Sequence, residues 1–174
     1  MNRIARIVVI SIIFSGLAYG VPRAEQACKQ SVLSTSPAAD FNLGQNGTAV
    51  DNKTGLMWMR CSLGQEWIEK ECRGEADLMN WGKSLQVSTG FEFAGYTDWR
   101  LPNKNELVSI VEERCSSPSI NSKIFPSAPP LFFWTSSPYA GLGHGAWSVD
   151  FGFGTVSATV KTGRLNVRLV RDLD

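Results

Sequence analysis

Four cysteines, Cys28, Cys61, Cys72 and Cys115, constrain the folding of this 174-residue chain more than any other feature of its sequence. An even number of cysteines in an exported chain is typical of disulfide bonds, and four cysteines allow three pairings. We favour Cys61–Cys72, which closes a short loop, and by elimination Cys28–Cys115. A zinc site is the alternative, but no Cys-x-x-Cys motif occurs and the single histidine, His144, is remote in sequence. We therefore expect two disulfides and no metal.

The first 20 residues predict export. Basic residues precede an apolar run over 7–18, and Ala18-Tyr19-Gly20 offers small residues at the −3 and −1 positions of a cleavage site. This layout is typical of a secretory signal peptide at residues 1–20. The run is about a dozen residues, shorter than the roughly 20 that span a bilayer, so an uncleaved anchor is the less favoured alternative. We expect no membrane span after cleavage, and a location in the periplasm, on the cell surface or outside the cell.

Size and charge exclude some classes of function. Removing 20 residues from 174 leaves 154, which is the size of one ordinary domain. The signal peptide holds two of the 17 basic residues and none of the 16 acidic ones, so the processed chain has a net charge of −1. Nucleic-acid binding needs a basic face, so we expect no nucleic-acid partner.

The N-terminal part predicts a lead-in and a hairpin. Residues 21–40, the lead-in, are small, polar and proline-containing, and we expect an extended segment tied down only by Cys28. Asn46-Gly47 is a strong turn signal, and a β-prone segment at 56–59 follows a second turn. These features predict an early β-hairpin, followed by a polar loop between Cys61 and Cys72.

Capping residues predict two helices. Asn80 can cap a short helix that would end before Gly90. Asn103 can cap a second one, and Glu106 can return a hydrogen bond to the cap backbone. An apolar stripe at spacings of three and four follows, and we expect this helix to end near Arg114.

The last part of the chain predicts a sheet. A proline-rich connection over 116–131 precludes regular structure there. The β-prone segments that follow are 132–136, 146–151, 155–160 and 166–170. Three or four short antiparallel strands fit this pattern. The predicted fold class is α+β: an early β-hairpin, two helices, a terminal antiparallel sheet and two disulfides.

Nothing in the sequence has the pattern of a catalytic site. A nucleophile needs a base within reach, and the one histidine, His144, lies in a glycine-rich loop without a Gly-x-Ser-x-Gly motif nearby. Disulfide pairing removes every thiol. The adjacent Glu112 and Glu113 point apart on a helix and indicate a solvated face. We therefore expect no enzyme activity and no cofactor.

Tryptophans and the terminal strands suggest recognition instead. Most of the six tryptophans, including Trp58, Trp81 and Trp147, are expected in the core, and Trp67 is the most exposed candidate. Side chains alternate across a strand, so an inward Trp147 leaves Ser148 and Asp150 facing outward. The glycine-rich loop over 141–145 and the turn at Gly152-Phe153-Gly154 flank them. An adaptable surface on a rigid sheet is typical of binding, although an ordinary solvated face is the alternative.

Four motifs carry a family resemblance. They are Val50-Asp51-Asn52 through Gly55-Leu56-Met57-Trp58; Gly95-Tyr96-Thr97-Asp98-Trp99-Arg100-Leu101-Pro102-Asn103-x-x-Glu106-Leu107; Trp134-Thr135-Ser136-Ser137; and Val167-Arg168-Leu169-Val170-Arg171. Over residues 41–172 their order and spacing resemble the Lcl C-terminal domain family of exported bacterial domains. That family takes its name from the C-terminal domain of a collagen-like surface adhesin. We interpret Asp98, Trp99, Arg100 and Glu106 within these motifs as structural.

The resemblance implies a C-type-lectin-like fold, related to that of formylglycine-generating enzymes and of retroelement-diversified variable proteins. It also implies a ligand-binding face on the terminal sheet. The side chains carried over to this face are Leu142, His144, Ser148, Asp150, Phe153, Thr155 and Ser157. The lectin calcium triplets Glu-Pro-Asn and Trp-Asn-Asp are absent, which argues against calcium-dependent sugar binding. No free-thiol pair corresponds to the copper site of the formylglycine-generating enzymes.

Three hypotheses follow. The preferred one is an exported, non-enzymatic module that recognises a glycan or protein through its terminal sheet. The second is a structural or accessory subunit of an envelope assembly. The third and weakest is an envelope enzyme of the formylglycine-generating type.

Overall fold

The computed structural model describes residues 26–141 and 143–173. The signal peptide predicted for residues 1–20 lies outside this range. The elements, in chain order, are β1 (Ala27–Cys28), the 3-10 helix η1 (Ala38–Asp40), β2 (Phe41–Leu43), β3 (Thr48–Asp51), β4 (Leu56–Met59), β5 (Glu66–Ile68), β6 (Glu71–Arg73), α1 (Trp81–Gln86), α2 (Lys104–Ser109), β7 (Cys115–Ser116), β8 (Phe132–Pro138), β9 (Gly145–Asp150), β10 (Thr155–Val160) and β11 (Val170–Asp172).

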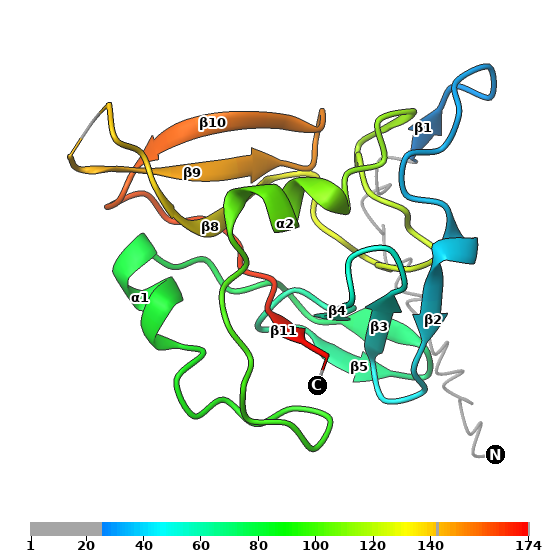
Figure 1. The fold of residues 1–174 in the computed structure, drawn as a ribbon, viewed down its shortest axis with the longest axis horizontal. Coiled ribbons are helices and arrows are strands. Elements are labelled where there is room, and N and C mark those ends of the chain that lie inside the picture. Colours follow the sequence, from blue (N-terminus) through cyan, green and yellow to red (C-terminus); the bar gives the residue numbers. More distant parts are fainter. Residues whose placement is uncertain (1–25, 142, 174) are drawn as a thin grey trace, which may run out of the picture.

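Two antiparallel sheets form the body of the molecule (Figure 1). One has the strand order β11-β4-β3-β2, and the terminal sheet has the order β10-β9-β8. The helix α2 packs against β8 and β9 of the terminal sheet, and its Leu107 belongs to the same core cluster as Trp58 of β4. The β5–β6 hairpin and the long-range antiparallel pair β1–β7 complete the pairing of the described strands. The predicted α+β class is confirmed.

The early hairpin forms where the turn signal predicts it. Gly47 has φ +84°, a conformation that glycine adopts without strain, and its carbonyl accepts a hydrogen bond from Arg60 N at 2.9 Å. β3 then pairs with β4, placing Ala49 opposite Trp58. The polar loop expected between Cys61 and Cys72 is itself the β5–β6 hairpin.

Both helix caps are confirmed. Asn80 accepts a hydrogen bond from Lys83 N, and Asn103 and Glu106 form a reciprocal capping box at α2. The prediction that α2 reaches Arg114 is wrong, since the helix ends at Ser109. Beyond Ser109 the chain becomes extended and pairs with the following loop: Val111 forms a β-bridge with Ile120, and Glu112 N donates to Ser119 O at 3.1 Å.

The final strand does not belong to the terminal sheet, which has three strands among the described residues and not the fourth that the sequence allows. β11 pairs with β4 instead, with Val170 opposite Trp58. The cause lies in the preceding residues: Met59 N donates to Leu169 O at 3.1 Å, and the buried Arg168 donates to Met59 O at 2.8 Å. These contacts draw the chain toward β4.

Both predicted disulfides, Cys28–Cys115 and Cys61–Cys72, are confirmed. The expectation that only Cys28 ties down the lead-in is wrong. Gln26 Nε2 donates to Pro118 O at 2.7 Å, and Thr35 Oγ1 donates to Val111 O at 2.9 Å. Polar side chains of the lead-in therefore bind main-chain carbonyls in the segment that follows α2. The described part of the lead-in packs against the domain through these bonds as well as through the disulfide.

Tryptophan placement follows the prediction in part. Trp58 is fully buried, as expected. Trp81 is half-buried beside a second core cluster, which includes Trp99, Trp134, Ala146 and Leu169. Trp67 is half-buried beneath Arg60, whose guanidinium lies 4.3 Å from the ring centroid. Trp147 is half-buried and belongs to neither core cluster, so its predicted core position is wrong.

Candidate functional site

The predicted ligand-binding residues divide between the two ends of the β9–β10 hairpin. His144 is exposed before β9, and Phe153 is exposed in the turn after it. Because six residues of β9 separate these ends, the two side chains lie roughly 20 Å apart along the strand. Leu142 lies outside the described residues. One compact site therefore cannot include both His144 and Phe153.

Ser148 and Asp150 are not on an outer surface, which corrects the prediction. Ser148 is fully buried, and its hydroxyl donates to Ser157 O at 3.1 Å. Asp150 is buried, and its Oδ1 accepts a hydrogen bond from Gly152 N at 2.7 Å. The alternation rule fails because β9 is the central strand of the terminal sheet and both of its faces are covered, one by each core cluster.

Thr155 and Ser157 lie on β10, the outer strand. Thr155 is opposite Asp150 and exposed, whereas Ser157 is opposite Ser148 and half-buried. Their side chains thus share a sheet face with the buried pair on β9 and lie at the accessible margin of that face.

Among the predicted residues that the structure describes, Phe153 lies at the edge of a cavity. Its side chain is 76% exposed and borders a hollow of about 390 Å³. Lys29 and Val32 of the lead-in line the same hollow, together with Glu113 and Arg114. The lining of this hollow thus combines two apolar side chains, Phe153 and Val32, with both basic and acidic side chains.

The turn that carries Phe153 is held in place from several sides. Gly154 N donates to Asp150 O at 2.7 Å, and Ser117 N donates to Gly152 O at 2.9 Å. Gly154 has φ +74°, and a Cβ there would lie 2.9 Å from a side-chain carbon of Val111. The aromatic ring is therefore exposed on a fixed turn.

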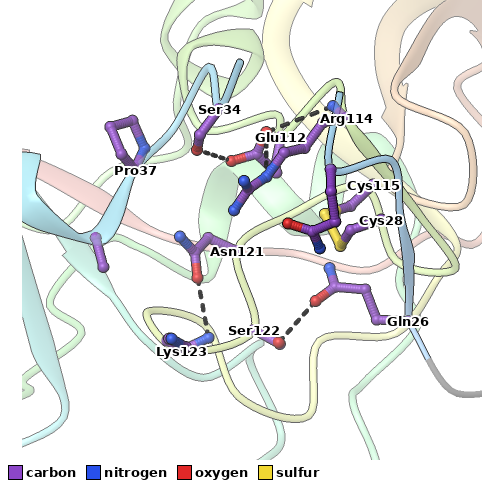
Figure 2. Close-up of a pocket in the computed structure, with 12 residues that line it drawn as sticks. Gln26, Cys28, Ser34, Pro37, Glu112, Arg114, Cys115, Asn121, Ser122 and Lys123 are labelled. Atoms are coloured by element: carbon purple, nitrogen blue, oxygen red, sulfur yellow. Dashed lines mark hydrogen bonds and ion pairs between the residues drawn. A yellow bond between two sulfur atoms is a disulfide. The ribbon is translucent and has the colours of Figure 1, made fainter. Parts of the chain in front are cut away.

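A second, polar cavity of about 510 Å³ lies beside the first (Figure 2). Cys28, Arg114 and Cys115 line both cavities. Figure 2 shows Gln26, Asn121, Ser122 and Lys123 along one side of it and Ser34 with Glu112 along the other.

Glu112 at the polar cavity is a structural carboxylate. Its side chain is 1% exposed and accepts hydrogen bonds from Ser34 Oγ and from Thr35 N at 3.2 Å. Arg114 approaches the same carboxylate, with Nε 3.6 Å from Oε1. These contacts fasten the lead-in to the end of the α2 region, so the predicted solvated face for Glu112 is wrong.

An aromatic pair lies at the other end of the terminal sheet. The rings of Tyr139 and Trp147 meet edge to face, with centroids 4.8 Å apart. The Lys104 ammonium lies 5.2 Å from the centroid of Trp147. The sequence interpretation missed this group because a period-two pattern cannot show that β9 turns Trp147 toward a partly open side.

Residues of the resemblance motifs clamp the fold, as the sequence interpretation expects. Trp99 is buried, and Arg100 binds Glu106 through two hydrogen bonds of 2.8 and 2.9 Å. These hydrogen bonds raise the pKa of Arg100. Arg171 Nε donates to Asp98 Oδ1 at 2.8 Å, and this bond lowers the pKa of Asp98.

Across residues 26–141 and 143–173, no group of three or more His, Cys, Asp or Glu side chains is placed to hold a metal ion. No helix within those ranges is long and apolar enough to cross a bilayer. All four cysteines are in disulfides.

The sequence model of the Lcl C-terminal domain family matches residues 47–171. The chain belongs to the Lcl C-terminal domain family. No curated protein matches the sequence. Phe153, Glu113 and Arg114 lie inside the matched Lcl range, whereas Lys29 and Val32 lie before it. The hollow at Phe153 thus combines the Lcl domain with the lead-in, and the only sequence signal for that contact was the Cys28–Cys115 pairing.

Proposed function

We propose that this Lcl-family protein is an exported, non-enzymatic recognition module that binds a glycan or a protein at the hollow around Phe153. The main support for this proposal is the exposure of Phe153. This residue is 76% exposed on a fixed turn, and it borders the hollow of about 390 Å³. An exposed apolar ring contributes nothing to the core, but it can stack on a sugar or anchor a protein contact.

The charges around the ring supply polar contacts. Lys29 and Arg114 are donors, and Glu113 is an acceptor, all lining the hollow with Phe153. Ligand sites commonly combine an apolar contact with a few polar groups that fix orientation. The disulfide Cys28–Cys115 forms part of the wall and limits how far the lead-in and the β7 segment can separate.

Two observations support export and a non-catalytic role. Two disulfides are compatible with an oxidising compartment, such as the periplasm or the cell exterior. The same pairing leaves no free thiol for chemistry of the formylglycine-generating type. Glu112, the buried carboxylate near the site, is occupied in holding Ser34 and the Thr35 backbone.

The test is a binding screen against glycan and protein arrays with the oxidised protein. Phe153→Ser is expected to weaken binding of any hit by about tenfold or more, which corresponds to the loss of one aromatic anchor. Leu33→Ser is the matched control, because Leu33 is 89% exposed and lines neither hollow. Equal binding by wild type and Phe153→Ser would rule out this site.

Crosslinking in intact cells separates the proposal from the envelope-subunit alternative. A stable protein partner that is captured without added ligand, and that remains bound to Phe153→Ser, would favour a structural subunit. Loss of capture in Phe153→Ser with retention in Leu33→Ser would support recognition at the hollow.

A further inference from the structure

β10 forms the open edge of the terminal sheet. Figure 1 shows it on the outside of the molecule, and among the described strands it pairs only with β9. The opposite edge, at β8, is occupied, since Trp134 N donates to Asn166 O at 3.0 Å and Asn166 N donates to Phe132 O at 3.1 Å. Within the described chain, this sheet therefore offers one edge for further pairing.

The register shows which main-chain groups face outward. Lys161 N donates to His144 O at 2.8 Å, one position beyond the last β10–β9 pair. Hydrogen-bonded pairs alternate along an antiparallel ladder, so Thr155, Ser157 and Thr159 also direct their main-chain groups toward β9. The main-chain groups of the intervening residues, Val156, Ala158 and Val160, then point away from β9. Val160 O already accepts a hydrogen bond from Gly163 N at 2.9 Å, so Val156 and Ala158 form the central part of this edge.

The side chains of β10 do not block this edge. The strand reads Thr-Val-Ser-Ala-Thr-Val, with no charged residue and no proline. Natural edge strands usually carry charges, prolines or bulges that prevent pairing, and the small β5–β6 pair illustrates this with Glu66, Glu71 and Arg73. Val156 and Val160 are 38% and 49% exposed.

We propose that two copies of this chain pair through β10, antiparallel, with the two-fold axis at Ala158. In that register Val156 lies opposite the partner's Val160, and Ser157 lies opposite the partner's Thr159. Apolar pairs then occupy one face and hydroxyl pairs the other, and both kinds of cross-strand pair are stabilising. The small Ala158 meets its own copy at the axis, and no like charges face each other along the strand.

The pairing closes at two copies, because a two-fold contact uses the same edge of both. An interface built on one six-residue strand is at the small end of specific interfaces, so we expect a reversible, concentration-dependent dimer. The two Phe153 turns then lie at opposite ends of a continuous six-stranded sheet. This arrangement goes beyond the proposed ligand site and would give it two binding positions per assembly.

Sedimentation of the oxidised protein from about 1 µM to about 1 mM tests the dimer, since a weak pair populates within this range. We expect the mass to rise from one chain to two and no further. Ala158→Lys places like charges at the axis and should raise the dissociation constant more than about tenfold. Leu43→Lys, on another exposed edge strand, should leave dimerisation unchanged. A monomer throughout, or larger aggregates, would contradict the proposal.

Cysteine crosslinking tests the register independently of affinity. Cα atoms of a hydrogen-bonded antiparallel pair are about 5.5 Å apart, within the range of a disulfide, so Ala158→Cys should form a linked dimer under mild oxidation. Val156→Cys alone should not, because two copies of that residue lie roughly 13 Å apart. A mixture of Val156→Cys and Val160→Cys should crosslink. Linkage of Val156→Cys to itself as efficiently as Ala158→Cys would overturn the register.

Discussion

Arg168 is a fully buried cation held by neutral partners. Its Nη1 donates to Met59 O at 2.8 Å and also to Arg60 O, and its guanidinium lies 4.7 Å from the Phe125 ring centroid and 5.8 Å from that of Phe133. Desolvation by burial lowers the pKa of Arg168 to about 9, which still leaves the side chain charged at neutral pH. At the residue scale this side chain joins the end of β4 to the segment that leads into β11.

Replacing Arg168 tests that role. Arg168→Met retains most of the side-chain volume but leaves the carbonyls of Met59 and Arg60 without their donor. We expect the free energy of unfolding to fall by about 2–4 kcal/mol, the cost of unsatisfied buried groups. Urea denaturation measures the change.

The control for that experiment is Arg164→Met. Arg164 is exposed and donates one hydrogen bond, to Leu78 O at 3.0 Å, so we expect a change within about 0.5 kcal/mol. Similar losses in both variants would show that burial of Arg168 is not what matters.

Individual side-chain positions were predictable only where local chemistry determines them. The caps Asn80 and Asn103 follow from spacing alone, and both are confirmed. The burial of Ser148 and Asp150 does not, because a two-residue period cannot reveal whether one face or both faces of a strand are covered. Nor can such a pattern show that Trp147, on the same strand, faces a partly open side.

At the scale of elements, α2 depends on its first turn. Asn103 Oδ1 accepts from Glu106 N at 3.0 Å, and Glu106 Oε2 accepts from Asn103 N at 2.7 Å. Glu106 also binds Arg100, so one carboxylate joins the helix start to the preceding segment. This six-residue helix is too short to be stable in isolation, so its cap and its packing must hold it.

Removing the cap should weaken the domain measurably. Asn103→Ala leaves the Glu106 backbone N–H without its side-chain acceptor, and we expect a loss of about 1 kcal/mol in unfolding free energy. Asn105→Ala, at an exposed position of the same helix, should be neutral or slightly stabilising. Thermal unfolding followed by circular dichroism compares the two, and a larger effect of Asn105→Ala would contradict the assignment.

The end of α2 and the sheet that β11 joins depend on tertiary contacts, so the sequence pattern does not predict them. The helical pattern continues past Ser109, yet the chain leaves the helix because Val111 pairs with Ile120. β11 likewise has a strand pattern that does not specify its sheet. Its partner β4 is determined by the buried Arg168 and by the hydrogen bond between Met59 N and Leu169 O.

The whole molecule is held by two crosslinks of different reach. Cys28 and Cys115 are 87 residues apart, whereas Cys61 and Cys72 are 11 apart. In the chain-entropy description these closures contribute about 5 and about 3 kcal/mol. The longer one also joins the lead-in to the wall of the Phe153 hollow.

Removing each disulfide as a serine pair tests this difference. We expect the Cys28→Ser and Cys115→Ser double variant to lose more stability than the Cys61→Ser and Cys72→Ser variant in urea denaturation. It should also release the lead-in, seen as faster amide exchange at Ser34 and Thr35. Unchanged exchange there would mean that the hydrogen bonds of the lead-in suffice without the crosslink.

The candidate site is a property of the assembled molecule. Sequence reasoning selected Phe153 as a recognition residue, and the structure places it in a hollow. The sequence alone does not identify Lys29, Val32 or Arg114 as neighbours of Phe153, because they are far from it along the chain and the lead-in has no periodic pattern. The segments meet through Cys28–Cys115 and the turn hydrogen bonds around Gly152.

The most direct test of recognition at this hollow is amide chemical-shift mapping with a ligand obtained from the arrays. We predict shifts concentrated in three segments that only the fold brings together, residues 29–32, 113–115 and 152–154, and their loss in Phe153→Ser. Shifts confined instead to the Tyr139 and Trp147 end of the terminal sheet, with these three segments silent, would contradict the account.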